Sequence, residues 1–232
     1  MRVSLRVLLG LCLLVGLGAL VPAVAGGPTC FGQPATIIGN GDDNTIDGTG
    51  GRDVIVARGG DDDVNGKGGR DLICGGPGDD TLDGARGNDK LDGEAGGGVG
   101  LPEKMFGGGG NDEILGGGGA DGIYGERGND ELLGEDGGDL MTGGRGSGSD
   151  YMDGGGGSDD ILGNGGDDGL YGQSGNDGLT GGQGSDDHYG HGGEDQINGA
   201  DGIPKNDVVD GGDDTDACDF DEGDQVNDCE PV

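Results

Sequence analysis

The sequence lacks tryptophan and is poor in the residue types from which a globular core is usually built. Hydrophobic residues make up 29% and aromatic residues 3% of its 232 residues, whereas an ordinary soluble domain is nearer half apolar. Prolines number only 7, and the 66 glycines do not recur at every third position, which excludes a collagen triple helix. The chain therefore needs a source of order other than a large apolar core.

Basic residues are also scarce. The chain has 12 lysines and arginines against 47 aspartates and glutamates, which gives a formal net charge of −35. This balance excludes proteins that hold a nucleic-acid backbone with a basic face, as well as cationic helices that lie on membranes. A chain so acidic and so poor in apolar residues is expected to stay disordered unless cations neutralise it.

The long apolar run of the sequence lies at its start. Arg2 and Arg6 precede an apolar stretch over residues 7–20, and Ala23-Val24-Ala25 forms a small-x-small cleavage site. This pattern predicts a secretory signal peptide over residues 1–25. The alternative, a membrane anchor, is disfavoured because the run is shorter than the ~20 residues that span a bilayer. We therefore expect a secreted, extracellular protein whose mature chain does not insert into a membrane.

Four cysteines remain after that cleavage: Cys30, Cys74, Cys218 and Cys229. An even number in an exported chain indicates disulfides. Of the three possible pairings we favour the sequence-local one, Cys30–Cys74 and Cys218–Cys229. A cysteine metal site is the alternative, but no C-x-x-C spacing supports it.

From Gly39 onward the sequence repeats every nine residues, and residues 75–83 (GGPGDDTLD) show the unit most clearly. Residues 93–106 form a degenerate unit in which Glu103 and Met105 fill the acidic and apolar positions, and two extra residues precede Asp150. His188 takes one apolar position. The large apolar residues at the eighth position are Ile46, Ile55, Val64, Ile73, Leu82, Leu91, Ile114, Ile123, Leu132, Met141, Met152, Ile161, Leu170, Leu179, Ile197 and Val209.

An acidic residue stands two places before almost every one of these apolar positions. These sixth-position aspartates are Asp53, Asp62, Asp71, Asp80, Asp89, Asp112, Asp121, Asp130, Asp139, Asp150, Asp159, Asp168, Asp177, Asp186, Asp195 and Asp207. Asn44 takes the corresponding place in the first unit and is neutral. A disordered acidic chain has no reason to keep such a phase, so the period indicates an ordered repeat.

The units match the pattern G-G-x-G-x-D-x-U-x, in which U is a large aliphatic residue. Over residues 39–212 the chain resembles the RTX, or hemolysin-type, calcium-binding repeat family. Segments around Cys30 and Cys74 and the closing Cys218 and Cys229 look like secreted repeat-only members from high-GC Gram-positive bacteria. The resemblance implies that the sixth-position aspartates and turn carbonyls of stacked turns hold calcium ions.

The residues themselves favour the same ion. Each unit offers one carboxylate and a glycine-rich turn whose carbonyl oxygens are unobstructed. Calcium accepts six to eight oxygen ligands in flexible geometry, whereas magnesium demands a stricter octahedron. Zinc prefers histidine or cysteine ligands, and the chain has only 2 histidines. The sites at Asn44, at Glu103 and at Asp150 depart from the pattern.

The predicted fold class is all-β: a parallel β-roll, or right-handed β-solenoid, of about nine two-unit turns. A three-residue x-U-x segment is too short to stand alone, so units n and n+2 must stack into two parallel sheets around a thin core. The expected domains are a signal peptide (1–25), an N-terminal cap (26–38), the roll (39–212, with an irregular junction at 93–106) and a C-terminal cap (213–232). Solenoid ends need caps because their edge strands are unpaired.

The leading functional hypothesis is a secreted, monomeric calcium-binding β-roll without catalytic activity, which folds when calcium binds. The sequence contains no G-x-S-x-G, no G-K-[ST] and no H-E-x-x-H motif. A calcium-stabilised adhesive or matrix protein, with cell-wall or matrix components as partners, is the alternative. An accessory repeat tail of a hydrolase or toxin is a weaker one. No nucleic-acid partner is expected.

Overall fold

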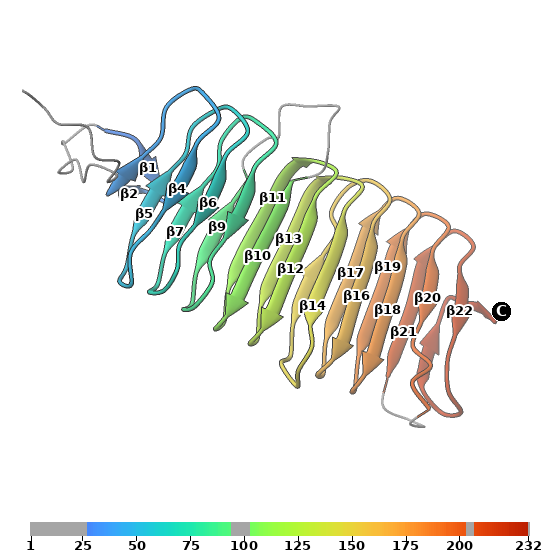
Figure 1. The fold of residues 1–232 in the computed structure, drawn as a ribbon. Coiled ribbons are helices and arrows are strands. Elements are labelled where there is room, and N and C mark those ends of the chain that lie inside the picture. The colour runs from blue at the N-terminus through green and yellow to red at the C-terminus, as the bar shows by residue number, and fades with distance from the viewer. Residues whose placement is uncertain (1–26, 94–102, 203–206, 232) are drawn as a thin grey trace, which may run out of the picture.

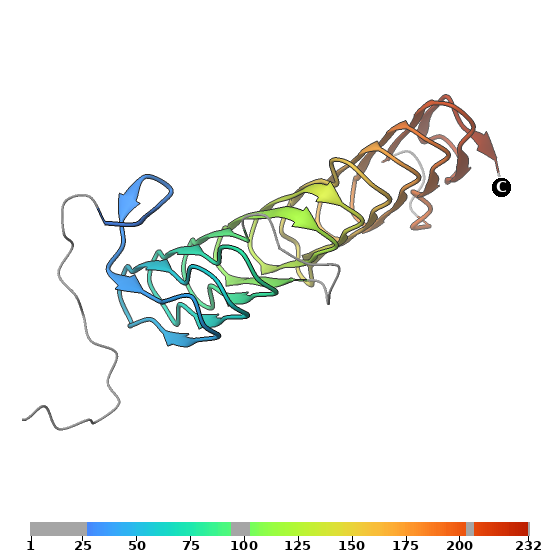
Figure 2. The same ribbon diagram turned by 90° about the horizontal axis from the view of Figure 1, so that it is seen from above.

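A computed structural model describes residues 27–93, 103–202 and 207–231. The predicted signal peptide over residues 1–25 lies outside the described residues. Figure 1 shows a rod in which short strands follow one another from the blue N-terminal end to the red C-terminal end. Seen from above in Figure 2, the chain is a flattened coil with strands on its two faces and turns along its two edges. No helix occurs in the described part of the chain.

The coil consists of two parallel sheets of 11 strands each. The even sheet contains β4 (Thr45–Asp47), β6 (Asp63–Asn65), β8 (Thr81–Asp83), β10 (Lys104–Gly109), β12 (Gly122–Arg127), β14 (Leu140–Gly144), β16 (Asp160–Gly165), β18 (Gly178–Gln183), β20 (Gln196–Asn198), β22 (Ala217–Asp219) and β24 (Glu230–Pro231). The odd sheet contains β3 (Ile37–Ile38), β5 (Val54–Val56), β7 (Leu72–Cys74), β9 (Lys90–Asp92), β11 (Glu113–Gly119), β13 (Glu131–Gly137), β15 (Tyr151–Asp153), β17 (Gly169–Ser174), β19 (Asp187–Gly192), β21 (Val208–Asp213) and β23 (Gln225–Asn227).

The nine-residue period sets the register of both sheets. Strands two units apart pair in parallel, so that Ile55 lies beside Ile73 and Ile73 beside Leu91. The eighth-position side chains point inward and are almost completely buried, forming one continuous apolar core between the sheets. The predicted parallel β-roll is therefore confirmed.

The irregular units keep this register. Met105 pairs with Leu82 on one side and Ile123 on the other, so the degenerate unit fills its core position as predicted. Met152 pairs with Leu132 despite the two extra residues before Asp150, because the insertion lies in a turn and leaves the strand unchanged. His188 occupies its inward position with no exposed surface.

The N-terminal segment forms a small antiparallel hairpin of β1 (Thr29–Cys30) and β2 (Gln33–Pro34). A disulfide joins Cys30 to Cys74 in β7, with their Cα atoms 5.7 Å apart. A second apolar cluster, which includes Val54 and Leu72, buries this disulfide against β5 and β7. Part of the expected cap over residues 26–38 thus lies against the odd sheet, while β3 pairs with β5 at the end of the rod.

The coil continues beyond residue 212. Strands β22, β23 and β24 extend the two sheets within the segment expected as a C-terminal cap. The core ends at Cys218, which takes an inward position and forms a disulfide with Cys229. Phe220 and Val226 pack against this end of the core. Both predicted cysteine pairs are therefore present.

Among the residues that the structure describes, no helix is long and apolar enough to cross a bilayer.

Candidate metal centres

Two columns of buried carboxylates run along the edges of the roll. All the predicted sixth-position aspartates are buried, none with more than 6% of its surface exposed. Glu103 and Asp216 are buried in the same way, at 3% and 1%. The odd edge, formed by the turns that lead into the odd sheet, carries Asp53, Asp71, Asp89, Asp112, Asp130, Asp150, Asp168, Asp186 and Asp207, and the even edge carries Asp62, Asp80, Glu103, Asp121, Asp139, Asp159, Asp177, Asp195 and Asp216. These residues are called the ladder carboxylates below.

One oxygen of each ladder aspartate after Asp53 is fixed by the turn stacked before it. The backbone N–H of Asp53 donates to Oδ1 of Asp71 at 2.8 Å, and the N–H of Asp71 donates to Oδ1 of Asp89 at 2.7 Å. The same bond recurs along the even edge, where the N–H of Asp121 donates to Oδ1 of Asp139 at 2.8 Å. Stacking therefore orients these aspartate carboxylates in the same way.

The second oxygen is left without a partner. Buried Oδ2 atoms with no hydrogen bond occur at nearly every rung of both ladders, for example at Asp89, Asp130 and Asp177. A buried anionic oxygen without a donor carries a large desolvation cost. The exception at the N-terminal end is Asp53, whose Oδ2 accepts the backbone N–H and the hydroxyl of Thr49. The unpartnered oxygen therefore recurs along both edges, from Asp62 to Asp216.

This second oxygen points at the first glycine of its own unit. A Cβ placed on Gly125 would lie 2.5 Å from Oδ2 of Asp130 and 2.6 Å from the carbonyl oxygen of Gly143 in the next stacked turn. The same pair of oxygens recurs at Gly163 and Gly190. Carboxylate and carbonyl oxygens are both acceptors, so their convergence is favourable only where a cation or a proton lies nearby.

The fourth glycine of the unit lets the turns approach so closely. Gly128 has a φ of 137°, which L side chains rarely adopt. A Cβ there would stand 1.4 Å from the carbonyl oxygen of Gly110 in the turn below. Any side chain at this position would push the stacked turns apart and disperse the oxygens.

Burial without a counter-ion raises the pKa of ladder carboxylates in the middle of the stack, such as Asp89, Glu103 and Asp130. Desolvation is the main cause, opposed by the backbone N–H bond, and it takes the pKa of Asp89 and Asp130 to about 7. Glu103 rises further, to about 9, because burial is reinforced by the charges of Asp121 and Asp80. A cation close to these groups would favour their ionised form at neutral pH.

The donor set fits a hard cation. Among the described residues, no group of three or more His, Cys, Asp or Glu side chains converges on one point. A site in either column must therefore combine carboxylate oxygens with main-chain carbonyl oxygens. An all-oxygen set of this kind suits calcium and gives zinc none of its preferred ligands.

The two histidines do not form a metal pair. His188 is fully buried in the core, where its Nδ1 lies 3.2 Å from the carbonyl oxygen of Val208. His191 is exposed and stacks against Tyr171 and Tyr189 on the outer face of the odd sheet. The Nε2 of His188 has no hydrogen-bond partner, so this residue is an imperfect substitute for an aliphatic side chain.

The prediction missed one ladder residue. Asp216 accepts the N–H of Asp195 at 2.9 Å, and its Oδ2 is buried without a partner. The signal was present in the sequence, because Asp216 follows Asp207 by nine residues. It was overlooked because Cys218, and not an aliphatic residue, follows in the apolar position.

The three units that differ from the repeat pattern, those of Asn44, Glu103 and Asp150, differ in whether they present a carboxylate at the ladder position. Asn44 is half-buried and accepts the N–H of Asn40 with its side-chain oxygen, so it presents no carboxylate. Asp150, which follows the insertion, still accepts the N–H of Asp130 at 2.8 Å. Glu103 lies at its expected rung, with both carboxylate oxygens buried and without a hydrogen bond.

Comparison with known protein families agrees with this geometry. The sequence model of the RTX calcium-binding nonapeptide repeat matches residues 38–73, 75–99, 102–132, 121–150, 144–179, 153–187 and 204–224. A comparison with curated proteins found no significant match. The family matches cover most of the chain and include all the ladder carboxylates except Asp195. The chain belongs to the RTX calcium-binding nonapeptide-repeat family.

Proposed function

We propose that the protein is a secreted calcium-binding β-roll without catalytic activity, and that extracellular calcium drives its folding. The ladder carboxylates are the proposed ligands, together with glycine carbonyl oxygens of adjacent stacked turns. The observation that carries the proposal is the buried Oδ2 atom that faces a carbonyl oxygen and has no donor, repeated along both edges.

Charge explains why folding and binding should be one event. The net charge of −35 opposes compaction. If about a dozen calcium ions bind, they offset about two-thirds of that charge. In the unfolded chain the carboxylates and carbonyl oxygens are not brought together, so the binding energy appears only on folding. A secreted chain would then remain extended until it meets millimolar calcium outside the cell.

The proposal is tested by far-UV circular dichroism of residues 26–232 during titration with calcium, with magnesium as the control. We expect a change from a disordered to a β spectrum that saturates with calcium and does not occur with magnesium at the same ionic strength. A β spectrum that is the same in chelator and in calcium would overturn the coupling of folding to binding.

A calcium-stabilised adhesive or matrix role is the second candidate. It is favoured by the regular outer face of the odd sheet, where Tyr151, Tyr171 and Tyr189 stack with ring centroids 5.0 Å apart. Retention of the folded protein by cell-wall material, compared with and without calcium, separates this role from simple calcium binding. No retention under either condition would remove it.

A further inference from the structure

The few arginines of this acidic chain are gathered on one edge of the roll. After residue 25 the sequence contains Arg52, Arg58, Arg70, Arg86, Arg127 and Arg145. All except Arg58 lie in turns of the odd edge, in the units of Asp53, Asp71, Asp89, Asp130 and Asp150. These five arginines are exposed. Five of six consecutive turns on this edge therefore present a guanidinium group, while the even edge presents one.

None of these five arginines forms an ion pair with a carboxylate of the described residues. The ion pairs found among the described residues join Lys67 to Asp47 and Lys90 to Glu113. In a chain with 47 acidic residues, unpaired arginines are not explained by the stability of the roll. Exposed guanidinium groups in a row are suited to bind an external anion, because each can hold a carboxylate or phosphate with two parallel hydrogen bonds.

Three of the arginines and one carboxylate, that of Glu126, line a cavity of about 650 Å³, so guanidinium groups outnumber the acidic group there. Arg86 lies beside Gly109, and Gly109 lies beside Arg127, so a rung without a side chain separates the first two. Arg145 follows Gly144, which pairs with Glu126, and is therefore on the rung next to Arg127. The rungs of a parallel sheet are ~4.8 Å apart, so the backbones of Arg86 and Arg127 are about 10 Å apart and those of Arg127 and Arg145 about 5 Å apart.

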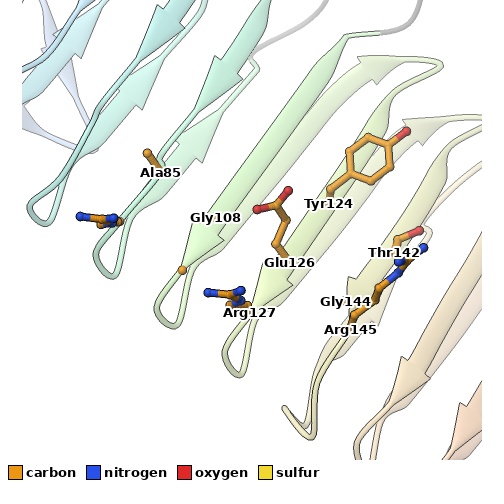
Figure 3. Close-up of a pocket in the computed structure, with 10 residues that line it drawn as sticks. Ala85, Gly108, Tyr124, Glu126, Arg127, Thr142, Gly144 and Arg145 are labelled. Carbon is orange, nitrogen blue, oxygen red and sulfur yellow. The ribbon is translucent and has the colours of Figure 1, made fainter.

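An aromatic ring forms one wall of this cavity. Tyr124 stacks on Phe106 with centroids 4.9 Å apart. On the opposite side of Tyr124, the next rung places the small side chain of Thr142. Figure 3 shows Tyr124 and Arg127 on one strand, with Thr142 and Arg145 beside them on the next. One ring face is thus left for a ligand, next to two guanidinium groups.

We propose that the cavity lined by Arg86, Arg127 and Arg145 binds an acidic oligosaccharide, with its carboxylate or phosphate groups on the arginines and a sugar ring against Tyr124. The cavity volume lies in the range of small-ligand sites. A single-stranded nucleic acid fits less well, because such ligands use several stacking platforms, and the residues that line the cavity include one aromatic ring, that of Tyr124. The row from Arg52 to Arg145 would let a longer acidic glycan continue along the edge.

The proposal requires the calcium-folded roll but assigns it a ligand that calcium binding alone does not imply. The test measures binding of fluorescent hexameric probes to the full mature chain in calcium at low ionic strength. The probes are a hexamer of uronic acid, a maltohexaose that carries phosphate groups, neutral maltohexaose and a six-nucleotide oligothymidylate. The first two distinguish carboxylate from phosphate as the natural anion, and either result supports the proposal.

The variant Arg86→Gln/Arg127→Gln/Arg145→Gln should lose at least tenfold in affinity for the acidic probe, and Tyr124→Leu should lose several-fold. The matched control is Arg58→Gln, which removes an exposed arginine from the even edge at a turn position that Gln173 already occupies with a similar positive φ. It should change affinity less than twofold. A triple lysine variant keeps the charge and should recover only part of the binding, because lysine lacks the planar fork.

Equal binding by the triple glutamine variant, equal binding of maltohexaose, or tighter binding of the oligothymidylate would overturn the proposal. Circular dichroism on the same samples reports calcium-dependent folding separately. Absence of acidic-glycan binding by the wild-type chain, in a sample that circular dichroism shows to be folded, would refute the cavity as a site and leave the calcium proposal intact. A failure of the wild-type chain to fold in calcium would refute the calcium proposal.

Discussion

The sharpest test of the ladder carboxylates is the change Asp130→Asn. The amide keeps an oxygen that can accept the N–H of Asp112, a bond of 2.8 Å in the wild type. It replaces Oδ2 by an NH₂ group, which faces the carbonyl oxygen of Gly143. Two acceptor oxygens that need a cation between them are thus replaced by an amide donor and a carbonyl acceptor, which need none. The substitution should therefore lower the stability of the fold in calcium and raise it without calcium.

The magnitude follows from linkage. A calcium site at 100 times its Kd contributes about 2.7 kcal/mol to stability, so losing one site should lower the free energy of unfolding by about 3 kcal/mol in saturating calcium. In calcium-free buffer the new hydrogen bond should stabilise the folded form by about 1 kcal/mol. Urea unfolding followed by circular dichroism measures the free energy of unfolding in calcium. The β content in chelator reports the stabilisation of the calcium-free fold.

The matched control is Asp136→Asn, which neutralises an exposed aspartate in the next turn of the chain. Its effect in calcium should stay within about 0.5 kcal/mol. The reasoning would be refuted if Asp130→Asn lost no more stability than this control in calcium, or if it lost as much in chelator as in calcium.

Three further predictions follow from the same geometry. In calcium-free buffer, burial raises the folded-state pKa of Asp130 from 3.8 to about 7. The metal-free fold should therefore be favoured below about pH 4 and lost as the pH rises through about 7, whereas calcium-driven folding should weaken on acidification. A circular dichroism spectrum without calcium that does not change between pH 8 and 4 contradicts this. Gly128→Ala should cost about 3 kcal/mol because of its φ and the nearby carbonyl oxygen, whereas Gly118→Ala, with its nearest atom 4.0 Å away, should cost less than about 1 kcal/mol; equal urea midpoints would refute the packing argument. His188→Leu should raise the melting temperature in calcium, because it removes a buried nitrogen without a partner and stabilises the core by about 1–2 kcal/mol; a lower melting temperature would show that the imidazole stabilises the core.

Most of the fold could be predicted from the nine-residue period of the sequence. It identified Ile55, Ile73 and Leu91 as stacked core residues, because a strict period leaves one register in which every inward position is apolar. The same period placed Met105 in the core across the degenerate junction. It also located the buried aspartates, since a fixed offset from the core position brings them to the same edge.

The ends of the roll were less predictable. The sequence indicated a cap around Cys30 but gave no sign that the hairpin would pack against β5 and β7, because that contact depends on the disulfide to Cys74 and on long-range packing. The array also appeared to end at residue 212, since Cys218 is not aliphatic. Cysteine is nevertheless a small buried hydrophobe, and its inward position extends the coil.

The finer geometry of the candidate sites depends on stacking and is not visible in the sequence. The period does not show that Oδ1 of Asp130 is satisfied while Oδ2 is left without a donor. The arginine edge was missed for a similar reason. Arg86, Arg127 and Arg145 are far apart in the chain, and only the two-unit coil brings them to neighbouring turns.

The most direct test of the calcium proposal is a crystal structure of the mature protein grown in calcium, with the ions located by anomalous scattering. We predict a row of calcium ions between the stacked turns of both edges, each contacting Oδ2 of a ladder carboxylate and glycine carbonyl oxygens at ~2.3–2.6 Å. An ordered roll whose ladder carboxylates contact no calcium would contradict the account.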